Sequence, residues 1–131
     1  MRRTEINNFF RNTKYSTELD FSKKMNNSKL ANKNIRKNAY WFTIDLDNRI
    51  KKDYHFVLYN QEKKVAIYLK VPPDFFLINR FSFSSRNNCP KMDIYLSCSE
   101  ETFLIDIKSG GSKFDFKPFI IEEFILGDLN D

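Results

Sequence analysis

The chain has 131 residues, of which 41% are hydrophobic and 30% are charged, and its formal net charge is +5. A chain of this length corresponds to one domain with enough apolar material for a core, which excludes a large two-domain enzyme and a chain disordered throughout. The sequence contains no apolar run of signal-peptide or membrane-span length, so we expect a cytoplasmic protein with no membrane partner.

Basic charge is concentrated at the N-terminal end. Residues 1–38 carry ten Lys or Arg against three acids, whereas residues 39–131 carry twelve against fourteen. The sequence therefore predicts a basic N-terminal arm and linker over 1–38 and a β-rich globular domain over 39–131. Within the arm, an irregular apolar pattern permits short helices over about 4–12 and 16–25, and the polar segment 26–38 is expected to be a flexible linker.

Apolar and polar residues alternate from Tyr40 onward. Tyr40, Phe42 and Ile44 share one face of a predicted strand, with Trp41 and Thr43 on the other face. The runs 54–59 and 65–70 are apolar, β-branched and aromatic, and the polar turn between them predicts a hairpin. Two prolines then end the second run, and a helical turn over 74–79 is expected to follow.

The C-terminal half adds four expected elements. They are a short strand over 81–84, a hairpin of 92–98 with 103–108, an edge strand over 114–116 and a closing helix over 118–126. The predicted fold class is therefore α+β, mainly β: a compact antiparallel sheet of five to seven short strands with a helical or flexible basic N-terminal arm.

The second hairpin contains the strongest catalytic candidate. If residue 98 opposes residue 103, Asp93 opposes Lys108 and Asp106 lies on the same face. With Pro90, these residues resemble the P-D…(D/E)-x-K signature of metal-dependent nucleases, in which two carboxylates hold Mg²⁺ and the lysine positions the attacking water. However, Pro90 stands three residues before Asp93, and Asp93 opposite Lys108 is equally an ordinary cross-strand ion pair. We therefore assign no catalytic residue, metal or cofactor, and keep a small Mg²⁺-dependent nuclease as an alternative.

The basic residues indicate nucleic-acid binding, because Lys and Arg neutralise phosphates and an aromatic ring stacks on exposed bases. The candidate residues are Arg2, Arg3, Arg11, Lys14, Lys33, Arg36, Lys37, Lys51, Lys52, Lys63, Lys64 and Lys70, with Trp41 as the stacking ring. The alternative interpretation is that a lysine-rich linker keeps the domain soluble and that the aromatic rings are core. Two cysteines, Cys89 and Cys98, have no metal-ligand spacing and are expected to be reduced thiols.

The Tyr40-Trp41-Phe42 opening, the proline corner at 70–76 and the segments 104–108 and 114–116 together resemble a small β domain of restriction-modification and related DNA-directed defence proteins. The resemblance runs from residue 38 to about residue 124. It implies a non-enzymatic nucleic-acid-binding or accessory module of a prokaryotic or phage defence-related system, acting on DNA rather than RNA, with a protein of a defence complex as a further partner.

A third function remains open at this point. The acidic C-terminal half could imitate phosphates, and the chain would then be a protein-interaction inhibitor that docks on a nucleic-acid-handling machine. The acidic residues concerned are Glu100, Glu101, Asp106, Asp115, Glu122 and Glu123.

Overall fold

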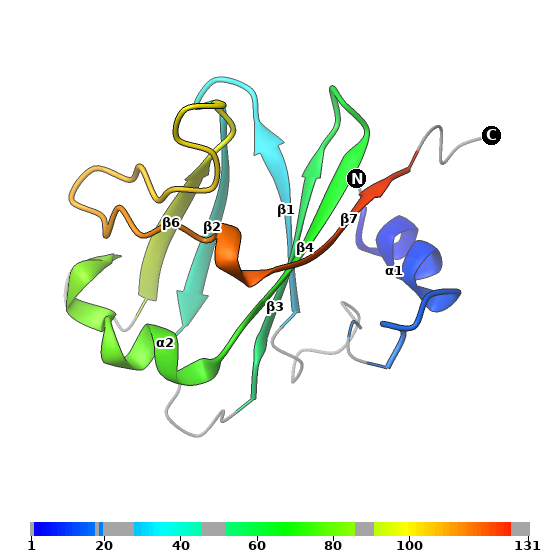
Figure 1. The fold of residues 1–131 in the computed structure, drawn as a ribbon, viewed down its shortest axis with the longest axis horizontal. Helices are drawn as coiled ribbons and strands as arrows, with labels where there is room; N and C mark the ends of the chain where they lie inside the picture. Colours follow the sequence, from blue (N-terminus) through cyan, green and yellow to red (C-terminus); the bar gives the residue numbers. More distant parts are fainter. Residues whose placement is uncertain (1, 18, 20–27, 46–51, 86–90, 127–131) are drawn as a thin grey trace.

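The computed structural model describes residues 2–17, 19, 28–45, 52–85 and 91–126. These residues form one seven-stranded sheet with the order β5-β6-β2-β1-β3-β4-β7 (Figure 1). The strands are β1 (Ser28–Asn34), β2 (Ala39–Asp45), β3 (Tyr54–Asn60), β4 (Val65–Val71), β5 (Ser84–Ser85), β6 (Lys91–Ser97) and β7 (Ile120–Ile125). The helices are α1 (Arg3–Arg11) and α2 (Pro73–Ile78), with two short 3-10 turns, η1 (Arg80–Ser82) and η2 (Lys117–Phe119). The predicted α+β, mainly β fold is confirmed.

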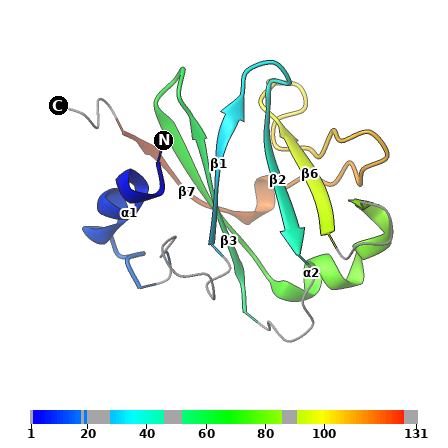
Figure 2. The ribbon, with the colours of Figure 1, turned by 180° about the vertical axis from the view of Figure 1, so that it is seen from behind.

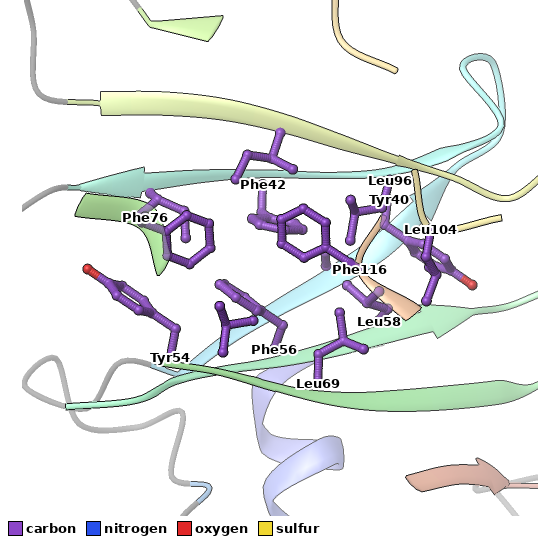
Figure 3. Packing of buried hydrophobic residues seen from close by; sticks show 14 of the residues in the cluster. Tyr40, Phe42, Tyr54, Phe56, Leu58, Leu69, Phe76, Leu96, Leu104 and Phe116 are labelled. Carbon is purple, nitrogen blue, oxygen red and sulfur yellow. The ribbon is translucent and has the colours of Figure 1, made fainter. Parts of the chain in front are cut away.

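The sheet bends so that its two halves share one core. β1 pairs with β2 at only two positions, Lys33 with Tyr40 and Asn34 with Ala39, and the two strands separate beyond them. The inner faces of β2–β6 and of β3–β4 therefore face each other, as Figure 3 shows, and Phe42 stacks on Phe56 with ring centroids 4.6 Å apart. Phe76 of α2 and Phe116 of the segment before η2 complete this core. The predicted alternation of buried residues along β2 is confirmed.

The helix α1 covers the outer face of one half only. Figures 1 and 2 place α1 beside β3, β4 and β7, at the far side of the molecule from β6. Its Ile6 and Phe10 are fully buried against a second cluster that includes Val57 and Tyr68. A helix over about 4–12 was expected and is confirmed as α1. The second expected helix, over 16–25, lies mostly outside the described residues.

The expected linker is wrong for residues 28–34. They form β1, which runs parallel to β3 from Ser28 opposite His55 to Asn32 opposite Tyr59. Of its residues, Leu30 packs in the α1 cluster and Ala31 in the shared core. The remaining five are Ser, Lys or Asn. Pairing with a strand on each side stabilises this polar segment, and such pairing overrides its weak intrinsic strand preference.

The C-terminal segment also differs from expectation. The closing helix predicted over 118–126 is wrong, because residues 120–125 form β7 antiparallel to β4. Isoleucine and phenylalanine suit a pleated surface as well as a helix face, and the edge of β4 offers unpaired backbone groups that a strand satisfies. No helix among the described residues has both the length and the apolar character needed to cross a membrane.

The hairpin predictions had mixed outcomes. The hairpin of 54–59 with 65–70 is confirmed as β3–β4, and the helical turn over 74–79 is confirmed as α2. The second hairpin is present in part, one residue out of the predicted register. Residues 104–107 run antiparallel to the end of β6, through the bridge of Leu96 to Asp106 and backbone hydrogen bonds to Tyr95 and Ser97, while β6 pairs along its whole length with β2 on its other edge. Residues 114–116 contribute only the bridge of Asp115 to Ile105, and the strand expected over 81–84 is reduced to β5.

Candidate functional site

An aromatic pair lies on the outer face of β2 and β6. The register pairs Trp41 with Tyr95, Thr43 with Asp93 and Asp45 with Lys91. The residues between them, such as Phe42 and Ile94, belong to the shared core, so these three pairs point away from it. The Trp41 and Tyr95 rings meet edge to face, with centroids 5.4 Å apart, and Trp41 is 42% exposed.

Two lysines bring positive charge to this pair. The Nζ atom of Lys37, from the β1–β2 turn, lies 4.8 Å from the centroid of the Tyr95 ring. The Nζ atom of Lys108, from the segment beyond β6, lies 5.2 Å from the same centroid. Both distances are within cation–π range. We call Trp41, Tyr95, Lys37 and Lys108 the aromatic–basic face.

Local structure fixes where Lys37 lies. Residues 35–38 form the tight turn between β1 and β2, and Asn38 adopts a left-handed backbone conformation with φ of 49°. The backbone N–H of Lys37 donates to the Asn34 Oδ1 atom at 3.1 Å, and the backbone N–H of Cys98 donates to the Asn38 carbonyl at 2.9 Å. This turn is therefore anchored to the end of β6, beside Tyr95.

The carboxylate of Asp106 fixes where Lys108 lies. Asp106 is fully buried and accepts hydrogen bonds from the backbone N–H groups of Tyr95 at 3.1 Å, Lys108 at 3.2 Å and Ser112 at 3.1 Å. The Ser112 hydroxyl donates a fourth, at 2.9 Å. A Cβ atom on Gly111 would lie 2.7 Å from the Lys108 carbonyl oxygen and 2.9 Å from Asp106 Oδ2, so this loop closes tightly only with glycine there. Asp106 thus links β6 to the segment that carries Lys108.

The nuclease arrangement predicted for Asp93, Asp106 and Lys108 is wrong. Asp106 bridges Leu96, one residue away from the predicted register. Because a one-residue shift moves every side chain to the other face, Asp106 lies with Leu96 on the core side, whereas Asp93 lies on the outer face. There Asp93 is buried and accepts a hydrogen bond from the Thr43 hydroxyl at 2.8 Å. Among the described residues, no group of three His, Cys, Asp or Glu side chains could hold a metal ion.

The other basic candidates differ in their exposure and in their contacts within the chain. Lys33 is ion-paired with Glu62, and its side chain is only 12% exposed, so it is not available to phosphate. Three more have contacts within the chain: Arg2 with Glu5, Lys70 with Asp53 and Lys14 with the ring of Tyr15. The remaining described candidates, Arg3, Arg11, Arg36, Lys52, Lys63 and Lys64, are exposed, and Lys51 lies outside the described residues.

Of the residues predicted from sequence, the structure brings Trp41 and Lys37 together. It adds Tyr95, which sequence reasoning missed, and gives Lys108 a place beside an aromatic ring. The alternation along 92–96 already put Tyr95 on an outward-facing position. The missing information was that β6 pairs with β2, which joins residues 46 to 58 positions apart in sequence.

A second polar cluster lies at the end of the shared core. Burial raises the pKa of the Tyr40 hydroxyl above its ordinary range, and it also raises the pKa of the Cys98 thiol. The two side chains are hydrogen-bonded to each other. Cys98 is a free thiol, and Cys89 lies outside the described residues. Burial therefore favours the protonated form of both side chains.

Comparison with protein-family models, with curated proteins and with solved structures found no match to this chain.

Proposed function

We propose that this chain is a non-enzymatic nucleic-acid-binding module that binds through the aromatic–basic face. The observation that carries the proposal is the half-exposed Trp41 ring beside Tyr95, with the ammonium groups of Lys37 and Lys108 within 5.2 Å of the Tyr95 centroid. Stacking of a base on an aromatic ring contributes about 1 to 3 kcal/mol, and the lysines supply the electrostatic attraction to phosphate.

Several features support binding over catalysis. The two carboxylates of the nuclease alternative lie on opposite sides of the sheet. Asp106 has four hydrogen bonds from its own surroundings, so it is committed to holding the loop. Its burial also removes it from the set of acidic residues that could imitate phosphates. With the resemblance described above, we propose DNA as the nucleic acid and an accessory role in a prokaryotic or phage defence system, where a protein of the same complex would be a second partner.

The test is fluorescence-anisotropy titration of labelled DNA and RNA at two salt concentrations, with Mg²⁺ present. We compare the wild type with Lys37→Gln/Lys108→Gln and with a charge-matched control, Arg11→Gln/Lys14→Gln, whose side chains are exposed at the end of α1, on the far side of the molecule from β6. The first pair should weaken binding about tenfold or more and make the salt dependence shallower by roughly 0.7 per lysine for a single strand. The control should change affinity only slightly.

Three outcomes would overturn the proposal. Equal loss in both double variants would mean that binding is spread over the whole basic surface. No binding at low salt would move the function to a protein partner. Cleaved probe would return the nuclease to consideration.

A further inference from the structure

We infer that the aromatic–basic face selects single-stranded over double-stranded nucleic acid, with one base stacked on Trp41 and the flanking phosphates held by Lys37 and Lys108. This inference rests on the proposed function and specifies its substrate class. It follows from the exposure and orientation of the rings, from the charges around them and from the placement of the helices.

The exposed ring requires an accessible base. Trp41 is 42% exposed on the surface of the sheet. In a duplex the faces of the bases are stacked on one another, so an indole on a sheet surface meets only sugar and phosphate. Single strands can place an unstacked base against such a ring, which is how sheet-based single-strand binders work.

The geometry of the pair indicates one stacked base. The planes of Trp41 and Tyr95 are inclined by 65°, so the two rings do not form a continuous flat platform. Tyr95 already has two ammonium groups near its ring, and Trp41 is the more exposed of the two aromatic residues. The base therefore stacks on Trp41, and the lysines near Tyr95 meet the backbone.

The surrounding charges set the path of the strand. Asp93 and Asp45 lie farther along the same outer face, at the end remote from the β1–β2 turn. Lys91, opposite Asp45, and the nearby Lys29 offset these two carboxylates, so this end of the face has no net positive charge to attract phosphate. The favourable path therefore crosses β6 at Tyr95, between the turn that carries Lys37 and the segment that carries Lys108.

The helices are poorly placed for reading a duplex groove. A helix that enters the major groove needs a free face, whereas α1 packs Ile6 and Phe10 into the sheet and α2 packs Phe76 into the core. At six residues, α2 is also short for such a role.

Trp41 is the single tryptophan of the chain, so its fluorescence reports directly on the site. The experiment titrates the protein with one unlabelled oligonucleotide as a single strand and as its duplex, as DNA and as RNA, while following both the Trp41 emission and the anisotropy of a labelled competitor. We expect the single strand to quench Trp41 and to bind at least about tenfold more tightly than the duplex at the same salt.

Two variants make the result specific. Trp41→Ala should weaken single-strand binding about fivefold to one hundredfold, the range that stacking free energies correspond to, and should leave duplex binding nearly unchanged. Phe81→Ala deletes an aromatic ring that is 92% exposed in η1, outside the aromatic–basic face, and should change neither affinity. Circular dichroism confirms that both variants are folded.

The outcomes separate the inference from the proposed function. Equal affinity for single strand and duplex, with Trp41 emission unchanged but with both affinities lowered by Lys37→Gln/Lys108→Gln, overturns the inference and leaves nucleic-acid binding in place. No binding of either form at low salt overturns both. Preference for single-stranded RNA over DNA supports the inference and corrects the proposed choice of DNA.

Discussion

The two outer faces of the sheet differ in what covers them. On β3 and β4, residues on the outer face such as Val57, Tyr59 and Tyr68 are buried beneath α1. On β2 and β6, the outer face carries Trp41, half-buried Thr43 and exposed Asp45, and α1 lies at the other side of the molecule (Figure 2). Among the described residues, a helix covers the outer face of one half of the sheet and no helix covers the other, where Asp93 and Ser97 of β6 are nevertheless buried.

The strand sequences already contain this difference. β3 and β4 are apolar or aromatic at nearly every position, which is typical of strands that are buried on both faces. Buried and more exposed residues alternate along β2 instead, which is typical of a strand with one face toward solvent. Apolar residues that are exposed singly are common on protein surfaces. Trp41 differs from these because the ring of Tyr95 and the ammonium groups of two lysines lie beside it. The comparison therefore separates a face that stabilises the fold from the face through which we propose that the chain binds nucleic acid.

The largest effect is expected from disrupting the packing of α1 on the half of the sheet that it covers. Phe10 is fully buried, with its ring 5.2 Å from that of Phe124 and 6.4 Å from that of Tyr68. Replacing a buried phenylalanine by alanine removes apolar contacts and leaves a cavity, so Phe10→Ala should lower the free energy of unfolding by about 3 to 5 kcal/mol. Urea unfolding followed by circular dichroism measures this change.

The matched control for this prediction is Phe81→Ala, the same deletion at an exposed position, which should change stability by less than about 0.5 kcal/mol. If Phe10→Ala also costs less than about 1 kcal/mol, α1 is not part of the cooperative fold, and the contrast between the two faces fails.

The next effect concerns Asp106, which fastens the segment beyond β6 to the half of the sheet that α1 does not cover. Asp106→Ala removes the acceptor of four hydrogen bonds and leaves buried donors without a partner. It should therefore lower the free energy of unfolding by about 2 to 4 kcal/mol. Asp115→Ala, which removes an exposed carboxylate paired with Lys117, should cost less than about 1 kcal/mol. A more stable Asp106→Ala variant would instead indicate a carboxylate kept for function at the expense of stability.

Sequence reasoning found the elements whose pattern is local. The alternation along 40–44 and the apolar runs around the 60–64 turn each contain enough information to specify a strand, and both are present as β2 and the β3–β4 hairpin. β1 and β7 were missed because their stabilisation is not local. β1 gains its pairing from strands on both sides, and β7 is a sequence that either a helix or the free edge of β4 could accept.

The candidate site shows the same limit. Trp41 and Lys37 could be named because an outward-facing tryptophan and a basic segment before it are visible in sequence. The placement of Tyr95 and of Lys108 depends on which strands β6 pairs with. The sequence indicated pairing only with the segment that follows it, 103–108. The one-residue difference in register at Asp106 was decisive, since it separates the two carboxylates that would have defined a metal site.

A smaller effect is expected from removing the hydrogen bond between Thr43 and Asp93 on the outer face of β2 and β6. Thr43→Val keeps the side-chain shape but removes the hydroxyl that donates to Asp93, so it should cost about 1 kcal/mol. A double-mutant cycle with Asp93→Asn tests whether the pair acts as a unit, and additivity within about 0.3 kcal/mol would show that it does not. If the pair is coupled, this face is stabilised by polar contacts where the other is stabilised by α1.

The smallest effect is confined to alkaline solution and concerns the end of the core that the two halves share. An ordinary thiol ionises at a pKa of 9.0, and burial raises the pKa of Cys98 above that value. In the unfolded chain the thiol therefore loses its proton first, so its contribution to stability is complete below pH 9 and is lost as the pH rises through the folded-state pKa. Lys29, whose pKa burial lowers, has the opposite sign, but it is present in both the wild type and Cys98→Ala and cancels in their difference. Urea unfolding from pH 7 to about pH 10 should therefore show the wild type losing stability faster than Cys98→Ala above pH 9. Parallel curves would mean that the Cys98 thiol is as solvated in the folded chain as in the unfolded one, and that the two halves do not close over it.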